Sequence, residues 1–188
     1  MLIGRLAQAA RLLLGLEYVV NGLNWWWKIL PFPSVSDPPL KNTPPFVQAM
    51  IDTDFMFAGT KVIEVVTGVM LLADLWVPLA LVVAFPVTVG IWSVDFLLIP
   101  GLIRAQVLGW SVLLLNAFLL LAYLSCYRPM LVAKAKPFGR VDVLPKPRQA
   151  RGESLRKGGL AVLGIASVVL GVLANGWCVV MIVQRFAT

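Results

Sequence analysis

The sequence has no histidine and almost no cysteine. Without an imidazole among its 188 residues, the chain cannot supply the ligands of a His-bound haem or of most zinc and copper sites. The base of Ser-His-Asp or Cys-His catalysis is missing as well. The 2 cysteines, Cys126 and Cys178, are far apart and form no C-x-x-C pair. One chain therefore cannot build an iron–sulfur cluster or a thioredoxin-like redox motif.

Charge is also scarce. Only 13% of the residues are charged and 60% are hydrophobic, whereas a soluble domain has about 25% charged and about 45–50% apolar residues. This composition excludes a soluble globular protein. It also excludes a disordered chain, which needs low hydrophobicity and high charge. The sequence therefore predicts an all-α integral membrane helical bundle, built from apolar segments of roughly 20 residues each.

Five segments are apolar and long enough to be spans, namely residues 12–30, 50–73, 78–99, 102–126 and 160–183. Between the first two, residues 31–45 hold six prolines. We expect this connection to run extended along the membrane surface, because proline interrupts a helix. Residues 127–157 form a longer basic connection with further prolines.

The lysine and arginine distribution predicts the orientation. With the N-terminus in the cytoplasm, eleven basic residues fall on the inner side and four on the outer side. Cytoplasmic loops of membrane proteins carry such an excess of positive charge. We therefore expect five spans with the N-terminus inside. The basic loop is expected to contact anionic lipid or an acidic protein partner. Nucleic acid is not expected as a partner, because no recognition motif accompanies the charge.

Polar residues of the first span repeat at helical spacing. Glu17, Asn21, Asn24 and Lys28 are spaced i, i+4, i+7 and i+11, which places them on one narrow stripe of a helix. Such a stripe is costly in contact with lipid, so we expect it to face other helices or a polar cavity.

Further polar residues lie at similar depth in the other spans. Lys61 and Glu64 are three positions apart, and Asn116 lies near the middle of its span. We expect an intramembrane cluster composed of Glu17, Asn21, Asn24, Lys61, Glu64 and Asn116. Two interpretations stay open: a structural ion pair that fixes helix register, and a binding or proton-handling site, for example for a quinone head group. No catalytic or metal-ligating set is predicted.

Two other patterns concern the surfaces of the helices. Trp25, Trp26 and Trp27 are typical of an aromatic anchor at the membrane interface, although a ligand-stacking platform is the alternative. The last span carries small or short polar residues on one face, which allow close helix packing. These are Gly164, Ser167, Gly171 and Asn175. Near the outer span ends, Asp52, Asp54 and Asp95 are expected to be solvated residues of the membrane interface, and a polar rim formed with Arg104 and Lys41 is the alternative.

Several stretches resemble the DoxX-like family of small membrane proteins. The segment from Arg11 to Asn24 and the following Pro-Phe-Pro resemble its first helix, and K-x-x-E-x-x-x-G-x-x-L-L, starting at Lys61, resembles its second. Residues 78–86 resemble the third helix, and Tyr-Arg-Pro-Met at 127–130 resembles the exit from the fourth. The resemblance covers about residues 5–130. It implies a four-helix bundle over 1–127, to which a basic cytoplasmic loop (128–157) and a fifth helix with a tail (158–188) are added.

The resemblance also implies that the protein is associated with redox enzymes in the bacterial inner membrane. The leading hypothesis is an accessory subunit of a respiratory or photosynthetic electron-transfer complex, which binds lipids and other membrane subunits and has no redox centre of its own. The alternative is a quinone-reducing subunit of a thiosulfate:quinone-type oxidoreductase, in which the polar cluster handles protons. A small transporter is a third hypothesis, against which the lack of a visible internal repeat argues. Quinone or lipid is the only cofactor expected.

Overall fold

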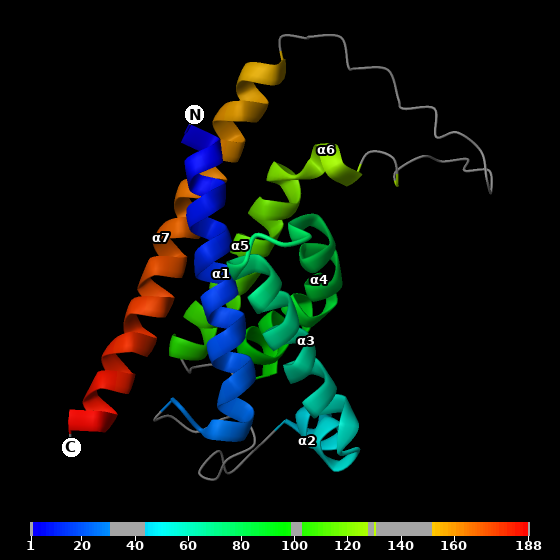
Figure 1. The fold of residues 1–188 in the computed structure, drawn as a ribbon, viewed down its shortest axis with the longest axis vertical. Helices are drawn as coiled ribbons and strands as arrows, with labels where there is room; N and C mark the ends of the chain where they lie inside the picture. Colours follow the sequence, from blue (N-terminus) through cyan, green and yellow to red (C-terminus); the bar gives the residue numbers. More distant parts are fainter. Residues whose placement is uncertain (1, 31–43, 99–102, 128–129, 131–151, 188) are drawn as a thin grey trace.

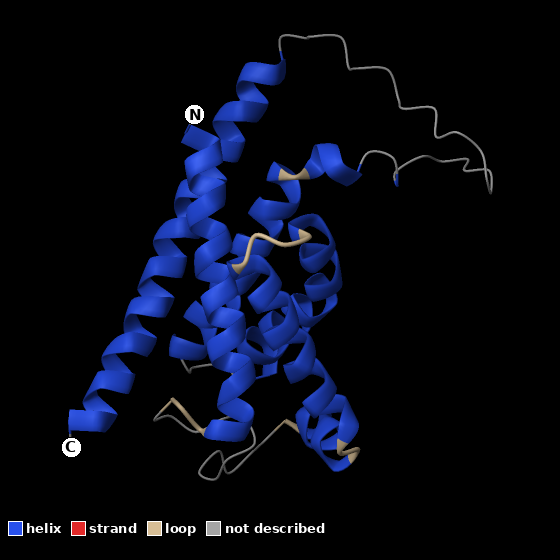
Figure 2. Cartoon of the chain, viewed as in Figure 1, coloured by secondary structure: helices blue, strands red, loops and turns tan. Residues whose placement is uncertain are grey.

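Long helices account for nearly all of the computed structural model, which describes residues 2–30, 44–98, 103–127, 130 and 152–187. No strand occurs in these ranges (Figure 2). The prediction of an all-α fold is confirmed. The helices are α1 (Leu2–Trp27), α2 (Pro45–Asp52), α3 (Phe55–Leu72), α4 (Val77–Ser93), the π-helix η1 (Val94–Leu98), α5 (Ile103–Ala122), α6 (Leu124–Tyr127) and α7 (Gly152–Ala187).

Four helical segments are long and apolar enough to cross a membrane. They are α3, α4 together with η1, α5, and the Lys157–Gln184 part of α7. The chain is therefore a multi-pass membrane protein. Helix α1 has the length of a span, but Arg5, Arg11 and Glu17 lower its apolar character, and it is not among the four.

Helix α1 nevertheless packs against three other helices of the bundle. It packs most extensively against α3 and also contacts α7 and α5. Figure 1 shows α1 and α7 close together near the N-terminus and diverging toward the C-terminus, with the two chain ends at opposite ends of the bundle. Because α1 has helices on several sides, its polar residues can be covered by protein instead of lipid.

The second predicted span is interrupted near its start. The sequence predicts one helix over 50–73, whereas α2 ends at Asp52 and α3 begins at Phe55. Asp54 between them has a φ of 55°, a left-handed conformation that aspartate tolerates better than most residues. Helix α2 begins at Pro45, where proline suits a first helical turn. The expected extended path of residues 31–45 falls mostly outside the described residues.

The connection between α3 and α4 is a tight turn that α1 contacts. Asp74 and Trp76 have φ values of 58° and 46°, so the chain reverses within a few residues. Arg11 donates from Nη1 to the carbonyl oxygen of Leu71 and lies 3.4 Å from Oδ1 of Asp74. The guanidinium thereby neutralises the C-terminal end of α3, where carbonyl groups lack helical partners.

The core lies between α1, α3, α4 and α5. Its buried apolar side chains form one cluster that includes Leu14, Tyr18, Leu71, Leu81 and Phe118. Helices α1 and α3 approach closely through glycine. A Cβ atom on Gly22 would lie 3.0 Å from the Lys61 carbonyl oxygen. Small residues permit this close approach of two backbones in a membrane.

Helix α7 packs on this core with one face only. Gly164 lies against the Phe118 ring, and Gly171 lies against Leu115 and Leu13. Only 17% of the apolar segment of α7 is buried, compared with 44% in α5. The remaining face of α7 exposes apolar side chains, among them Ile165, Val169, Val172 and Leu173.

Candidate functional site

A buried carboxyl group stands where α1, α5 and α7 meet. Glu17 is only 2% exposed. Its Oε1 accepts a hydrogen bond of 2.6 Å from the Ser111 hydroxyl and one of 3.1 Å from the Asn175 amide. The same amide also donates to the carbonyl oxygen of Gly171 at 2.9 Å. The other oxygen, Oε2, is buried and has no hydrogen-bond partner among the described residues.

A second polar group lies beside it, formed by three neutral side chains. The Asn116 amide donates to the Tyr18 hydroxyl at 3.0 Å and to the Thr88 hydroxyl at 2.9 Å, and the two hydroxyls are bonded to each other. Thr88 also donates to the carbonyl oxygen of Ala84 at 3.0 Å. The group therefore links α1, α4 and α5 by side-chain hydrogen bonds. The Asn116 Oδ1 atom is buried without a partner in the described chain.

The third polar group is an ion pair on α3. Lys61 Nζ lies 2.7 Å and 3.0 Å from the two carboxylate oxygens of Glu64, which is 2% exposed. The same ammonium lies 5.4 Å from the centre of the Phe57 ring. Asp95 is close enough to this pair to interact with both charges. A buried carboxylate is tolerated when a cation is held against it in this way.

A π-helix turns Asp95 toward the bundle interior. Asp95 lies in η1, directly after α4, and its Cβ would stand 3.0 Å from a Cβ built on Gly109 of α5. The prediction that these aspartates are solvated is confirmed for Asp52 and Asp54, which are exposed. It is wrong for Asp95, which is partly buried. The extra residue in a π-turn rotates the following side chains relative to a regular α-helix.

The predicted polar stripe is divided among different partners. Glu17 contacts α5 and α7, whereas Asn24 accepts a 2.7 Å hydrogen bond from the Leu30 backbone and so closes the end of α1. Asn21 and Lys28 are partly buried. Lys61 pairs with Glu64, whereas the described bonds of Glu17 come from neutral groups.

The three consecutive tryptophans differ in their surroundings. Trp25 packs against Phe57 with ring centres 4.8 Å apart, and Lys28 Nζ lies 5.2 Å from the Trp25 ring. Trp26 and Trp27 are 47% and 69% exposed. An anchoring role suits the two exposed rings, because indole favours the membrane interface.

A further aromatic group lies between α4, η1 and α5. Trp92 stacks on Phe96 at 5.5 Å, and Trp110 meets both rings edge-on at 5.4 Å and 5.5 Å. The Trp92 indole N–H is buried and has no acceptor among the described residues. Trp92 and Phe96 lie four residues apart along α4 and η1, whereas Trp110 comes from α5, so spacing along one helix did not predict this group.

The small residues predicted for packing on α7 all face the core. Gly164 and Gly171 touch α5, and Ser167 donates to the Leu163 and Leu114 carbonyl oxygens at 2.7 Å and 3.1 Å. Asn175 is different from the others, because its amide reaches the carboxyl group of Glu17. Helix α7 therefore contributes a polar group to the interior and not only contact area.

The basic loop lies mostly outside the described residues. Lys157, at its end, is exposed, and α7 already begins at Gly152, within the segment expected to be loop. In the part of the chain that the structure describes, no three His, Cys, Asp or Glu side chains are grouped as metal ligands.

Three interior side chains were missed from the sequence, namely Tyr18, Thr88 and Ser111. Each stands in an apolar stretch, where one hydroxyl group does not change the predicted span. A hydroxyl group inside a membrane helix is a weak signal, because it can also bond to the backbone of its own helix. Comparison of the chain with models of protein families, with curated proteins and with solved structures finds no match.

Proposed function

We propose that this chain is a DoxX-like accessory subunit of a bacterial electron-transfer complex in the inner membrane. In this proposal α1 also spans the membrane, the N-terminus is cytoplasmic, and the subunit has no redox centre of its own. The resemblance of residues 5–130 to that family supports it. So does the position of Gly68, a motif residue, which lies against Gly15 at the contact of α1 and α3.

The observation that supports an accessory role most is the one-sided packing of α7. Its small residues and Asn175 face the bundle, and its other face presents exposed β-branched and leucine side chains. A helix attached in this way can offer its second face to another membrane subunit. Small-residue and apolar contacts are the usual means by which membrane helices associate.

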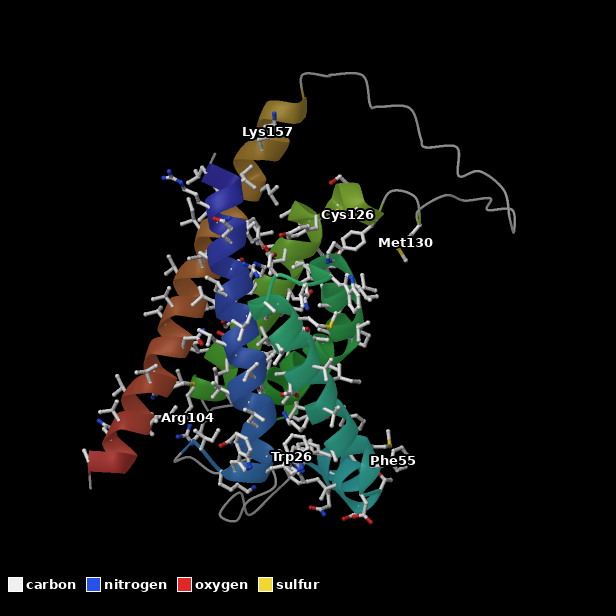
Figure 3. The ribbon with its side chains drawn as sticks, viewed as in Figure 1. Trp26, Phe55, Arg104, Cys126, Met130 and Lys157 are labelled. Atoms are coloured by element: carbon white, nitrogen blue, oxygen red, sulfur yellow. The ribbon has the colours of Figure 1, made fainter. Side chains whose placement is uncertain are left out.

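The positions of the chain ends support the proposed orientation. Figure 3 shows Cys126 and Lys157 at one end of the bundle, and Trp26, Phe55 and Arg104 at the other. The N-terminus lies at the end of Cys126 and Lys157 (Figure 1). The basic loop begins and ends there too, as the positive-inside rule requires of a cytoplasmic side.

The test is purification from native membranes in a mild detergent, followed by mass spectrometry of the proteins that accompany the chain. The proposal expects a stoichiometric cytochrome, reaction centre or dehydrogenase. A homogeneous protein without partners contradicts it.

Two matched variants test whether the partner subunit binds the exposed face of α7. Val169 on α7 and Val66 on α3 are 54% and 52% exposed. We expect Val169→Trp to lose the partner and Val66→Trp to retain it, because only the former changes the outer face of α7. Equal retention by both variants argues against docking through α7.

The Lys61–Glu64 pair supports a second candidate, a quinone-reducing subunit. Lys61 offers an ammonium donor beside the Phe57 and Trp25 rings, a combination of a polar anchor and an apolar wall that suits a quinone head group. Quinone supplies the electron-accepting chemistry when it is bound. This candidate expects the purified complex to reduce a quinone analogue with thiosulfate and expects Glu64→Gln to abolish that activity.

A further inference from the structure

Glu17 is a buried carboxyl group that no cation contacts in the described part of the chain. Its described partners are a hydroxyl group and an amide, both neutral, and both bind the same oxygen. The Lys61 ammonium lies against Glu64 at 2.7 Å and 3.0 Å. An ionised carboxylate in an apolar interior is very costly unless a cation compensates it, and such a group takes up a proton instead.

The charged and titratable side chains around Glu17 do not compensate the cost of an ionised carboxylate there. Tyr18 lies next to Glu17 on α1, the Lys61–Glu64 pair lies on α3, and Asp95 lies on η1 beside that pair. On α7, Cys178 is close enough to Glu17 to interact with its charge. Helix α5 provides the neutral Ser111 and Asn116. Among these groups Lys61 is the only cation, and its ammonium group contacts the carboxylate of Glu64.

The hydrogen bonds also distinguish the two oxygens of Glu17. Ser111 and Asn175 converge on Oε1, as donors do on the carbonyl oxygen of a neutral carboxylic acid. The other oxygen, Oε2, is left without a described partner in a side chain that is 2% exposed. An ionised oxygen without a partner leaves a buried charge uncompensated, whereas a neutral hydroxyl group leaves only an unpaired polar group, so the missing partner favours a proton on Oε2.

We propose that Glu17 is a reversible proton-binding site, enclosed by α5 and α7. The proton resides on Oε2, while Ser111 and Asn175 hold Oε1. Release of the proton leaves a carboxylate that these two donors alone stabilise. Asn175 makes the last helix part of the site. The inference goes beyond an accessory role and does not depend on it, because it concerns only groups within this chain.

Carbodiimide labelling of the full chain in membranes tests the site. A protonated carboxylic acid adds across one C=N bond of dicyclohexylcarbodiimide to form an O-acylisourea, which rearranges to a stable N-acylurea. Glu64 is the matched control, since it is equally buried but paired with Lys61. We expect label on the peptide that contains Glu17 at neutral pH, its loss in Glu17→Gln and its retention in Glu64→Gln. Label on Glu64 alone, or none on either residue, overturns the proposal.

An infrared measurement on the unchanged protein covers the case in which Glu17→Gln does not fold. The proposal expects the C=O stretching band of a protonated carboxyl group at neutral pH. Ser111→Ala and Asn175→Leu each remove a hydrogen bond to Oε1, so both variants should shift the band to higher wavenumber. A missing band, or a band that neither variant moves, contradicts the assignment to Glu17. Copurification of a partner is not needed for either readout.

Discussion

Gly15 of α1 and Gly68 of α3 lie directly against each other. A Cβ atom on Gly68 would stand 2.9 Å from the Gly15 carbonyl oxygen, and one on Gly15 would stand 3.1 Å from the Gly68 carbonyl oxygen. Each glycine thus faces the backbone oxygen of the other, and the side chains of Leu72, Tyr18 and Val19 lie about equally close. The two helices can keep their present separation only while both positions remain glycine.

The first prediction follows from this contact. Gly68→Ala should lower the free energy of unfolding by about 1–3 kcal/mol, the range for overpacking a well-packed contact. Thermal unfolding in detergent, followed by tryptophan fluorescence, measures the loss. Gly90→Ala is the control, because nothing lies within 4 Å of a Cβ at that helical position. If both variants unfold at the same temperature, the close approach of α1 and α3 is not required for stability.

Arg11 provides a second prediction. It donates to the backbone at the end of α3 and contacts Asp74, while its own side chain is 11% exposed. Arg11→Met should cost about 1.5–3 kcal/mol of stability, the range for a hydrogen bond to a charged group. The exposed Arg5 serves as the comparison, and Arg5→Met should leave the unfolding temperature nearly unchanged. An equal effect of both changes would point to lost surface charge and not to the lost bond.

The Lys61–Glu64 pair allows a double-mutant cycle. Lys61→Met leaves a buried carboxylate unpaired and should cost about 3–5 kcal/mol, whereas Lys61→Met combined with Glu64→Leu should recover most of that loss. Unfolding in detergent gives the coupling free energy. This is the outcome of a structural ion pair. If Lys61→Met instead folds normally and only ligand binding is lost, the pair serves a binding site.

The two cysteines report the orientation. Cys126 is exposed on α6, whereas Cys178 is partly buried within the span of α7. A membrane-impermeant maleimide should therefore label Cys126 in inside-out vesicles and leave it unlabelled in intact spheroplasts. Cys126→Ser should remove the signal. Labelling of Cys126 from the outer side would falsify the cytoplasmic assignment of the N-terminal end of the bundle.

Ionisation of the Tyr127 hydroxyl group should lower the stability of the fold at alkaline pH. Its hydroxyl donates to the Pro78 carbonyl oxygen at 3.0 Å, and burial raises its pKa to about 12. The unfolded chain loses this proton near pH ~10, so the bond should stabilise the fold fully below that pH and progressively less as the pH rises to about 12. Unfolding temperatures of wild type and Tyr127→Phe should therefore converge over this interval. A constant difference across it contradicts the role of the hydroxyl proton.

The polar stripe of α1 illustrates how far the sequence predicts the interior. Helical spacing correctly places Glu17 and Asn24 on a buried side, because periodicity depends only on the geometry of one helix. The choice of partners depends on how two helices are rotated against each other. Nothing in the spacing could therefore indicate that Lys61 pairs within α3, or that Asn175 reaches Glu17 from the far end of the chain.

Two local departures from regular α-helix could not be predicted from the sequence either. The break at Asp54 occurs without proline or glycine, and the π-turn that moves Asp95 inward follows a regular apolar helix. The inward position of Asp95 is accompanied by a tertiary contact with Gly109. The apolar spans themselves were predictable, because hydropathy over about 20 residues reflects bilayer thickness and not the neighbouring helices.

The bond between Glu17 and Asn175 joins residues 158 positions apart in the sequence. Helix α1 leaves the ribosome before α7. Through most of synthesis, Glu17 therefore lacks the amide that covers it, and the first helix stays poorly suited to lipid. We therefore expect α1 to reach its final position in the membrane only after α7 has been inserted beside it.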